Sequence, residues 1–132
     1  MCHLRKIRGS ATRKILLVDD HPEIRQLVKM TLGKGFEIFE AEDGRSALRL
    51  TLEHKPDLLV LDIMMPGEID GLRVLKAIKV DHALRNTKVI LVSARGQEKD
   101  KQEGLLQGAD AYLVKPFSPL KLNEMIKEML KV

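Results

Sequence analysis

Cysteine, tryptophan and long apolar runs are the scarce features of this 132-residue sequence. The one cysteine, Cys2, has no second cysteine in the chain, so a disulfide framework is excluded and a reducing cytoplasm fits. The chain has no stretch of about 18 apolar residues, and its basic first residues lack the apolar segment of a signal peptide. The sequence therefore predicts a soluble, cytoplasmic protein without a membrane span.

Aromatic residues are also few, with one tyrosine and three phenylalanines. Lysine and arginine number 23 against 19 acidic residues, which leaves a formal charge of +4. Because no basic run is interleaved with aromatic residues, this composition does not favour nucleic-acid binding. A nucleic-acid-binding module that uses the basic N-terminal segment stays an alternative, and its binding would depend strongly on salt.

Short apolar runs alternate with longer segments of helical period along the chain. The five runs are KILLVDD, FEIFEA, LLVLD, KVILVS and AYLVK. Each is too short for a buried helix. This alternation is typical of a parallel sheet with helices on its faces, so the predicted fold class is α/β. The length fits one domain, predicted over residues 13–132 after a basic, disordered tail at residues 1–12.

Five helices are expected to follow these runs. Pro22 starts the first at its N1 position, Asp43 caps the second, and Ser118 with Pro119 starts the last. The fourth, within EKDKQEGLLQG, is short and polar, and Gly104 weakens it. The apolar faces expected to pack on the sheet comprise Ile24, Leu27, Val28, Thr31 and Leu32; Ala47, Leu48, Thr51 and Leu52; Leu72, Leu75 and Ile78; and Leu122, Met125, Ile126, Met129 and Leu130.

Four of the apolar runs end in functional groups: Asp19 and Asp20, Asp62, Ser93, and Lys115. Parallel strands bring their carboxyl ends to one edge of a sheet, where ligands of open α/β sheets bind, so these groups can converge. Three crowded carboxylates repel one another unless a cation neutralises them, and hard oxygen ligands favour Mg²⁺. The ammonium and hydroxyl groups suit an anion, and a phosphoryl group is the anion that fits bound Mg²⁺.

These motifs resemble the receiver domains of two-component response regulators, from Lys14 to the C-terminus. LLVDDHPEIRQLV resembles the acidic-pair strand and first helix, LLVLDIMMPG the phosphoacceptor strand and loop, VILVSA the switch strand, and YLVKPF the end of the fifth strand. The resemblance implies a flavodoxin-like (βα)5 domain of three layers with strand order 2-1-3-4-5. It also implies a phosphorelay receiver rather than an enzyme, one that catalyses only its own phosphorylation and slow dephosphorylation.

The resemblance assigns a role to each residue of the site. Asp62 is the phosphoacceptor, whose carboxylate attacks the phosphorus of a phosphohistidine donor and becomes an acyl phosphate. Asp20 would bind Mg²⁺ directly and Asp19 directly or through water. Asp62 and the backbone carbonyl of Met64 would complete the protein ligands. Lys115 would pair with the phosphoryl oxygens.

A switch is also implied by the resemblance. Ser93 is expected to reach toward the phosphoryl group, and Tyr112 to turn inward as Ser93 moves, which carries the signal to the surface near the fourth helix and fifth strand. The Lys115–Pro116 peptide bond is expected to be cis. The implied partners are a sensor histidine kinase or histidine phosphotransfer protein, and a downstream effector protein or second receiver.

The loop after the phosphoacceptor departs from the family pattern. MPGEIDGL places two residues, Glu68 and Ile69, between Gly67 and Asp70, where the family has one. The insertion leaves open how the third helix starts and which partners contact this loop. Met64 offers no polar group to orient a hydrolytic water, so slow self-dephosphorylation is expected.

An aspartyl-nucleophile phosphatase is the enzyme alternative. The haloacid dehalogenase pattern requires a second aspartate two residues after the nucleophile as general acid, and Met64 stands there instead. Simpler interpretations also exist for single residues: the acidic pair capping a helix, Ser93 bonding the backbone, and Tyr112 packing at a sheet edge. His21 is expected to be a solvated loop residue rather than a ligand.

Overall fold

Parallel strands and covering helices alternate through the computed structural model, which describes residues 12–94 and 96–131. The strands are β1 (Arg13–Val18), β2 (Phe36–Ala41), β3 (Leu58–Asp62), β4 (Lys88–Ser93) and β5 (Ala111–Val114). The helices are α2 (Pro22–Leu32), α3 (Gly44–His54), α4 (Gly71–Val80), α5 (Glu98–Leu106) and α6 (Pro119–Leu130).

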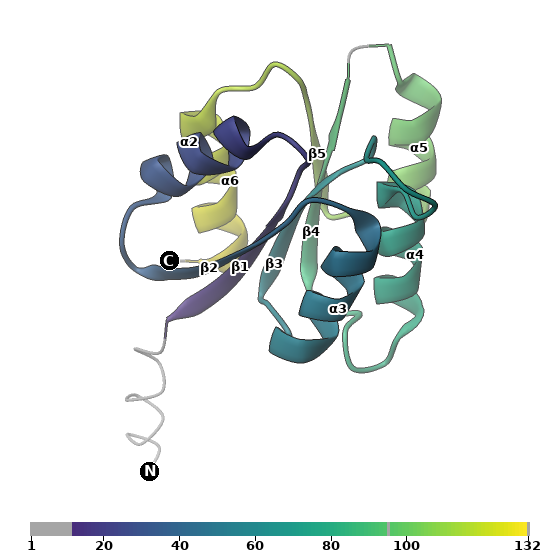
Figure 1. The fold of residues 1–132 in the computed structure, drawn as a ribbon, viewed down its shortest axis with the longest axis horizontal. Helices are drawn as coiled ribbons and strands as arrows, with labels where there is room; N and C mark the ends of the chain where they lie inside the picture. Colours follow the sequence, from purple (N-terminus) through teal and green to yellow (C-terminus); the bar gives the residue numbers. More distant parts are fainter. Residues whose placement is uncertain (1–11, 95, 132) are drawn as a thin grey trace.

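The strands form one five-stranded sheet with the order β2-β1-β3-β4-β5. All four neighbouring pairs are parallel. Helices α2 and α6 lie on one face of the sheet, and α3, α4 and α5 lie on the other (Figure 1). This arrangement confirms the predicted α/β fold of three layers and its 2-1-3-4-5 strand order.

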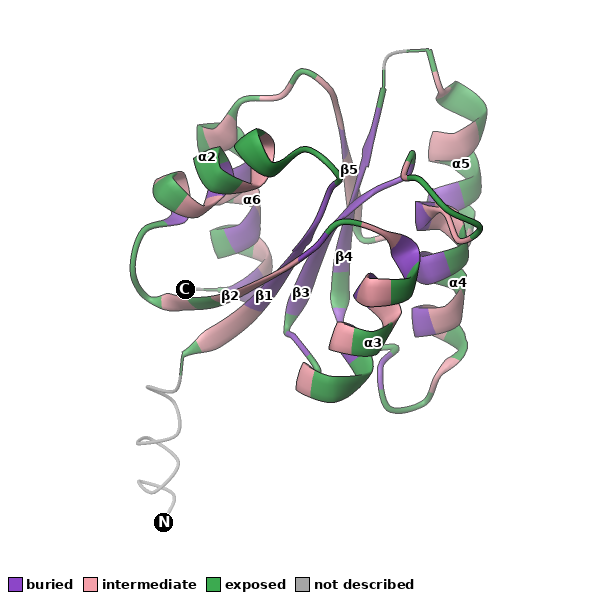
Figure 2. Ribbon diagram, viewed as in Figure 1, coloured by how far each residue is buried: buried purple, intermediate pink, exposed green. Residues whose placement is uncertain are grey.

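The central strands are buried along most of their length (Figure 2). Their side chains contribute to two separate cores. Alternate residues of a strand point to opposite faces. Leu59 of β3 packs with Leu75 of α4 in one core, whereas its neighbour Leu58 packs with Ile126 of α6 in the other. Continuous apolar strands of this kind are typical of a parallel sheet covered on both sides, and they hold the strand ends in fixed positions.

The predicted helix starts are confirmed. The Asp43 side chain accepts from the backbone N–H of Ser46, and Ser118 accepts from Lys121. The predicted apolar faces are too wide at two positions, because Leu27 and Leu52 are 51% and 56% exposed.

The reason is geometric, since each of these leucines directly neighbours a buried residue, Val28 or Thr51. A helix turns by about 100° per residue, which carries the neighbour off the buried face. The polar helix α5 does form, with Gly104 as its buried residue.

The predicted tail at residues 1–12 lies outside the described residues except for Thr12. Among the described helices, none has the length and apolar character needed to cross a membrane.

Candidate functional site

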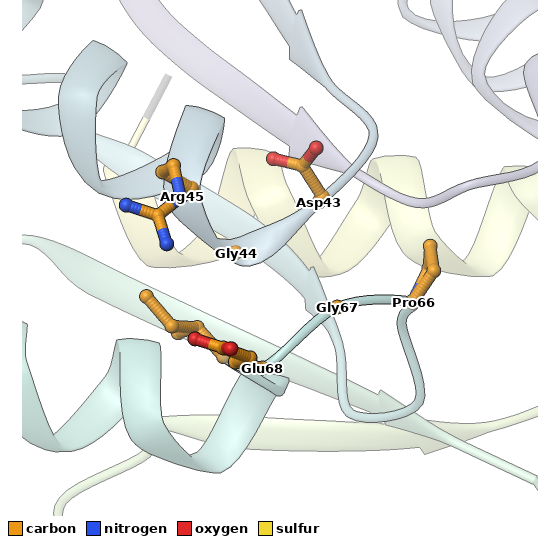
Figure 3. Close-up of a pocket in the computed structure, with 7 residues that line it drawn as sticks. Asp43, Gly44, Arg45, Pro66, Gly67 and Glu68 are labelled. Carbon is orange, nitrogen blue, oxygen red and sulfur yellow. The ribbon is translucent and has the colours of Figure 1, made fainter.

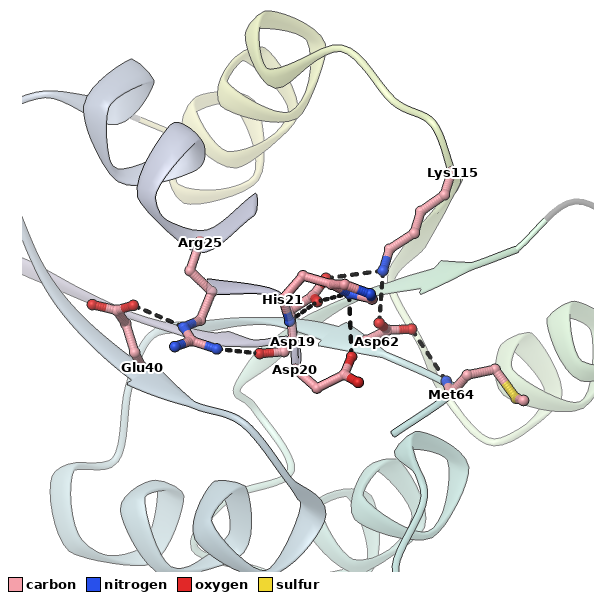
Figure 4. A network of polar contacts seen from close by, with 8 residues as sticks. All are labelled: Asp19, Asp20, His21, Arg25, Glu40, Asp62, Met64 and Lys115. Atoms are coloured by element: carbon pink, nitrogen blue, oxygen red, sulfur yellow. Dashed lines mark hydrogen bonds and ion pairs between the residues drawn. The ribbon is translucent and has the colours of Figure 1, made fainter. Parts of the chain in front are cut away.

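Four of the predicted site residues lie at the carboxyl edge of the sheet because each follows or ends an apolar strand. Asp19 follows β1, Asp62 ends β3, Ser93 ends β4 and Lys115 follows β5. Asp62 is only 3% exposed, and Asp19 and Ser93 are also buried. The side chains of Asp19, Asp20, Asp62 and Lys115 point toward one another (Figure 4). The structure thus brings together the carboxylates and the ammonium that the sequence predicts.

Lys115 joins two of the carboxylates. Its Nζ lies 2.8 Å from Asp62 Oδ2 and 3.0 Å from Asp19 Oδ2. The second oxygen of Asp62 accepts a hydrogen bond of 3.1 Å from the backbone N–H of Met64. The Lys115–Pro116 peptide bond is cis, as predicted.

The buried carboxylates and the ammonium perturb one another. Burial raises the pKa of the Asp62 carboxyl above its ordinary value, and the nearby charge of Asp19 adds to this rise, while Lys115 opposes it. Burial alone would lower the pKa of Lys115, but hydrogen bonds to Asp62 and Asp19 outweigh this effect and raise it. A positive charge among the carboxylates is therefore stabilised.

His21 also reaches the acidic pair, which the sequence did not predict. Its ring Nδ1 lies 2.8 Å from Asp19 Oδ1 and 3.2 Å from Asp20 Oδ1. The hydrogen bond to Asp19, followed by the charge of Asp20, raises the pKa of His21. The side chain is 54% exposed, so the expected solvent contact is present, but the ring is also part of the site.

The donor set fits a divalent cation. One ligand atom from each of Asp19, Asp20, His21 and Asp62 can be chosen so that all four lie within 4.8 Å of one another. Three carboxylate groups are the oxygen ligands that Mg²⁺ prefers. The side chain of Met64 is directed away from the site, and its backbone follows Asp62 closely enough to donate to it (Figure 4).

Arg25 of α2 stabilises the backbone of the segment that carries Asp19 and Asp20. It donates from one guanidinium nitrogen to the backbone carbonyl of Asp19 and from Nε to Glu40 of β2 at 2.8 Å. Lys29, one turn along α2, also pairs with Glu40 at 2.7 Å. The sequence gives one sign of this network, since Arg25 and Lys29 stand four residues apart on one helix face, a spacing that places both side chains beside a common partner.

This network predicts a pH-dependent part of the stability. The hydrogen bond from Lys29, together with Arg25, lowers the pKa of Glu40 below its ordinary 4.5 although burial opposes them. A lowered folded-state pKa stabilises the fold above the unfolded-state pKa, and this contribution is lost as the pH falls through the folded-state value. Thermal melts should therefore show Glu40→Gln less stable than the parent near neutral pH, with the gap closing below pH 4.5. Lys29→Gln should weaken the same dependence, and a gap independent of pH would contradict the assignment.

The two predicted switch residues lie on neighbouring strands. Ser93 of β4 is paired in register with Val114 of β5, and its carbonyl accepts from the backbone N–H of Lys115 at 2.8 Å. Tyr112 lies two residues before Val114 on β5, is partly buried and packs against the core that includes Leu75 of α4. Lys101 of α5 places its ammonium 4.0 Å from the centre of the Tyr112 ring, a contact that the sequence did not indicate.

The inserted loop leaves the start of α4 intact. Asp70 is the N-cap of α4 and accepts from the backbone N–H of Arg73 at 3.0 Å. Gly71 follows, and a side chain at this position would collide with the backbone carbonyl of Asp62. The close approach that glycine permits lets α4 begin directly behind the predicted phosphoacceptor.

The extra residue instead fills space against α3. Ile69 lies over Gly44, the first residue of α3, where a Cβ would collide with the Ile69 carbonyl oxygen. Beside this contact is a hollow of about 350 Å³ lined by Asp43, Arg45, Glu68 and their neighbours (Figure 3). Asp19, Asp20 and Asp62 do not line this hollow, so the inserted loop borders a surface next to the site.

Comparison with protein families matches residues 15–127 to the response regulator receiver domain. The chain is 42% identical over 120 residues to the phosphate regulon transcriptional regulatory protein PhoB of Klebsiella pneumoniae, with 90% of this chain and 52% of that protein covered. It is 40% identical over 121 residues to the transcriptional regulatory protein SrrA of Staphylococcus aureus, with 91% of this chain and 48% of that protein covered. The chain thus spans about half the length of these curated relatives.

Solved structures of receiver proteins are similar to this chain over nearly the whole length of both chains. The receiver domain of the Francisella response regulator 1452 superimposes with a TM-score of 0.81 at 36% identity, covering 91% of this chain and 98% of that one. The chemotaxis protein CheY4 of Vibrio cholerae gives 0.80 at 34% identity, covering 89% and 98%.

Proposed function

Since the chain belongs to the family of response regulator receiver domains, we propose that Asp62 accepts a phosphoryl group from a phosphohistidine donor, with Mg²⁺ held beside it. The family acts in two-component signalling, and this chain is a receiver domain of that kind. The observation that carries the proposal is the buried Asp62 carboxylate at 2.8 Å from Lys115, with Asp19 and Asp20 next to it.

Each side chain has a defined part in the transfer. An Asp62 oxygen attacks the phosphorus, a new P–O bond forms, the P–N bond to the donor histidine breaks, and the leaving imidazole keeps the bond electrons and takes up a proton. Lys115, already hydrogen-bonded to Asp62, pairs with the phosphoryl oxygens and offsets their charge. Asp19, Asp20, Asp62 and the Met64 carbonyl would hold Mg²⁺, which would further neutralise the charge of the phosphoryl oxygens.

Mass spectrometry of the intact chain tests this proposal. Incubation with acetyl phosphate and Mg²⁺ should add one phosphoryl group, and a chelator should prevent the addition. The added group should be lost in base, as an acyl phosphate is. A chain that gains no phosphoryl group, or gains one without a divalent cation, would contradict the proposal.

The phosphorylated state is proposed to last long because Met64 cannot position water. Its side chain is 59% exposed and carries no hydrogen-bond donor to orient a water on the phosphorus. Met64→Asn should therefore shorten the phosphoryl lifetime several-fold, measured by intact mass after removal of the donor. Met64→Leu is the matched control and should keep the parent lifetime; equal lifetimes for all three proteins would rule out this role for the side chain.

The signal is proposed to leave the site through Ser93 and Tyr112. Phosphorylation places about two negative charges beside Asp19, Asp20 and Asp62. The Ser93 hydroxyl is a donor on the neighbouring strand that can move to these charges. Its displacement then lets Tyr112 move, which disturbs the Lys101 contact and shifts the surface of α5, β5 and α6.

Ser93→Ala should separate the chemistry from the signal. The phosphorylation rate should stay within about tenfold of the parent, since one hydrogen bond is lost. The amide NMR shifts that a beryllofluoride mimic causes at Tyr112 and along α5 should, however, largely disappear. Ser93→Thr keeps the hydroxyl and should restore them. Shifts confined to the loops around Asp62 in the parent itself would exclude this switch.

Membership of the receiver-domain family also supports a proposal for the partners. A sensor histidine kinase or a histidine phosphotransfer protein would supply the phosphoryl group, and an effector protein or second receiver would bind the switched surface. PhoB and SrrA are named as transcriptional regulatory proteins, and this chain matches about half of each. We do not expect this domain by itself to bind nucleic acid. A cytoplasmic location stays a prediction.

A further inference from the structure

His21 contacts both members of the acidic pair, and we propose that its ring nitrogen is an additional metal ligand. This nitrogen raises the preference of the site for first-row transition-metal cations, Mn²⁺ among them, above that of a receiver site with oxygen donors alone. The inference rests on the proposed function, because it concerns the cation held beside Asp62.

The distances around His21 are those between ligands of one ion. Two ligands at about 2.1 Å from a metal and at right angles to each other lie about 3.0 Å apart. His21 Nδ1 lies 2.8 Å from Asp19 Oδ1 and 3.2 Å from Asp20 Oδ1. The ring nitrogen therefore already stands at the separation from each carboxylate oxygen that a shared cation requires, and coordination would need little movement of the ring.

The ring of His21 does not help to hold the start of helix α2. His21 is the N-cap residue of α2, but its side chain makes no capping hydrogen bond. Its backbone N–H donates to Asp19 Oδ1 at 2.8 Å, which fixes the main chain while the ring itself is more than half exposed. The charged groups that face the ring are Asp19, Asp20 and Lys115. The ring can thus exchange its hydrogen bond for a metal bond without unfolding the helix start.

A nitrogen ligand increases the binding affinity of some cations more than that of others. Mg²⁺ is a hard ion that prefers oxygen ligands, whereas imidazole binds divalent first-row transition metals, whose affinity rises from Mn²⁺ to Cu²⁺. Mn²⁺ gains least in this series, but it also accepts carboxylate oxygens and can therefore occupy the same site as Mg²⁺. A simple structural role is the competing explanation, in which His21 only hydrogen-bonds the carboxylates. The two explanations differ in whether nitrogen is bonded to the ion.

Pulsed electron paramagnetic resonance of the Mn²⁺ complex distinguishes them, because coupling to ¹⁴N appears when nitrogen is bonded to the ion. All proteins should carry Cys2→Ser and His3→Gln, since both side chains can themselves hold transition metals. In this background the parent should show ¹⁴N coupling. His21→Asn places an oxygen donor near the position of Nδ1 and should bind Mn²⁺ without the coupling. His82→Asn, at an exposed histidine, is the matched control and should retain it.

Competition between the two ions gives a second measurement. His21→Asn should lower the ratio of Mn²⁺ to Mg²⁺ affinity by about tenfold, a typical cost for a change around a metal ligand. Parent protein that binds Mn²⁺ without ¹⁴N coupling, or an unchanged ratio in His21→Asn, would overturn the inference while leaving Mg²⁺-dependent phosphorylation intact. A parent that binds neither ion and gains no phosphoryl group would overturn the proposed function as well.

Discussion

Asp62→Asn should lower the rate of phosphorylation by at least about 10³-fold, the scale seen when a covalent nucleophile is removed. The amide that replaces the carboxylate has no negative oxygen to attack phosphorus. Phosphoryl incorporation from acetyl phosphate, followed by intact mass, measures the loss.

The control for Asp62→Asn is the same chemical change beside the site. Glu68→Gln removes an exposed carboxylate from the inserted loop, and its rate should match the parent. Circular dichroism of both variants checks that the fold is kept. Phosphorylation of Asp62→Asn at the parent rate would remove the basis for assigning the acceptor.

Lys115→Ala should have opposite effects on two properties of the site. Phosphorylation should slow by about 10²-fold, the usual cost of removing a group that stabilises charge in a transition state. Metal affinity should rise, because the ammonium no longer competes with the cation for Asp19 Oδ2 and Asp62 Oδ2, which it contacts at 3.0 and 2.8 Å. Calorimetric titration with Mg²⁺ and the phosphorylation rate together measure both effects.

Two further variants sharpen the Lys115 prediction. Lys115→Arg keeps the positive charge and should retain weak metal binding with part of the rate. Lys34→Ala removes an exposed lysine after α2 and should change neither property. An unchanged rate in Lys115→Ala, or weaker metal binding, would show that the ammonium does not act as described.

The strands and the strand-end groups could be predicted from the sequence because both depend on short-range pattern. Buried parallel strands require runs of apolar residues, and the polar residue that ends each run must lie at the sheet edge. The convergence of Asp19, Asp62 and Lys115 follows from that rule alone. Caps such as Asp43 were predictable for the same reason, since the capping bond spans only three residues.

Contacts made by long side chains were not predictable in this way. Arg25 reaches the carbonyl of Asp19, and Lys101 reaches the ring of Tyr112, through rotamers that depend on the finished packing. His21 was expected to be a solvated residue because its neighbours in sequence gave no sign that its ring would turn back onto the acidic pair. The sequence showed the insertion at Glu68 and Ile69 but not where it packs.

Borohydride reduction of the phosphorylated parent, followed by peptide mapping, tests the central claim most directly. Hydride converts an acyl phosphate to an alcohol with release of phosphate, so an acceptor aspartate becomes homoserine. After incubation with acetyl phosphate and Mg²⁺, homoserine should be found at position 62, and it should be absent when the cation is chelated. Homoserine at Asp19 or Asp20, or a phosphoryl group that survives reduction on another side chain, would contradict the assignment of Asp62 as the acceptor.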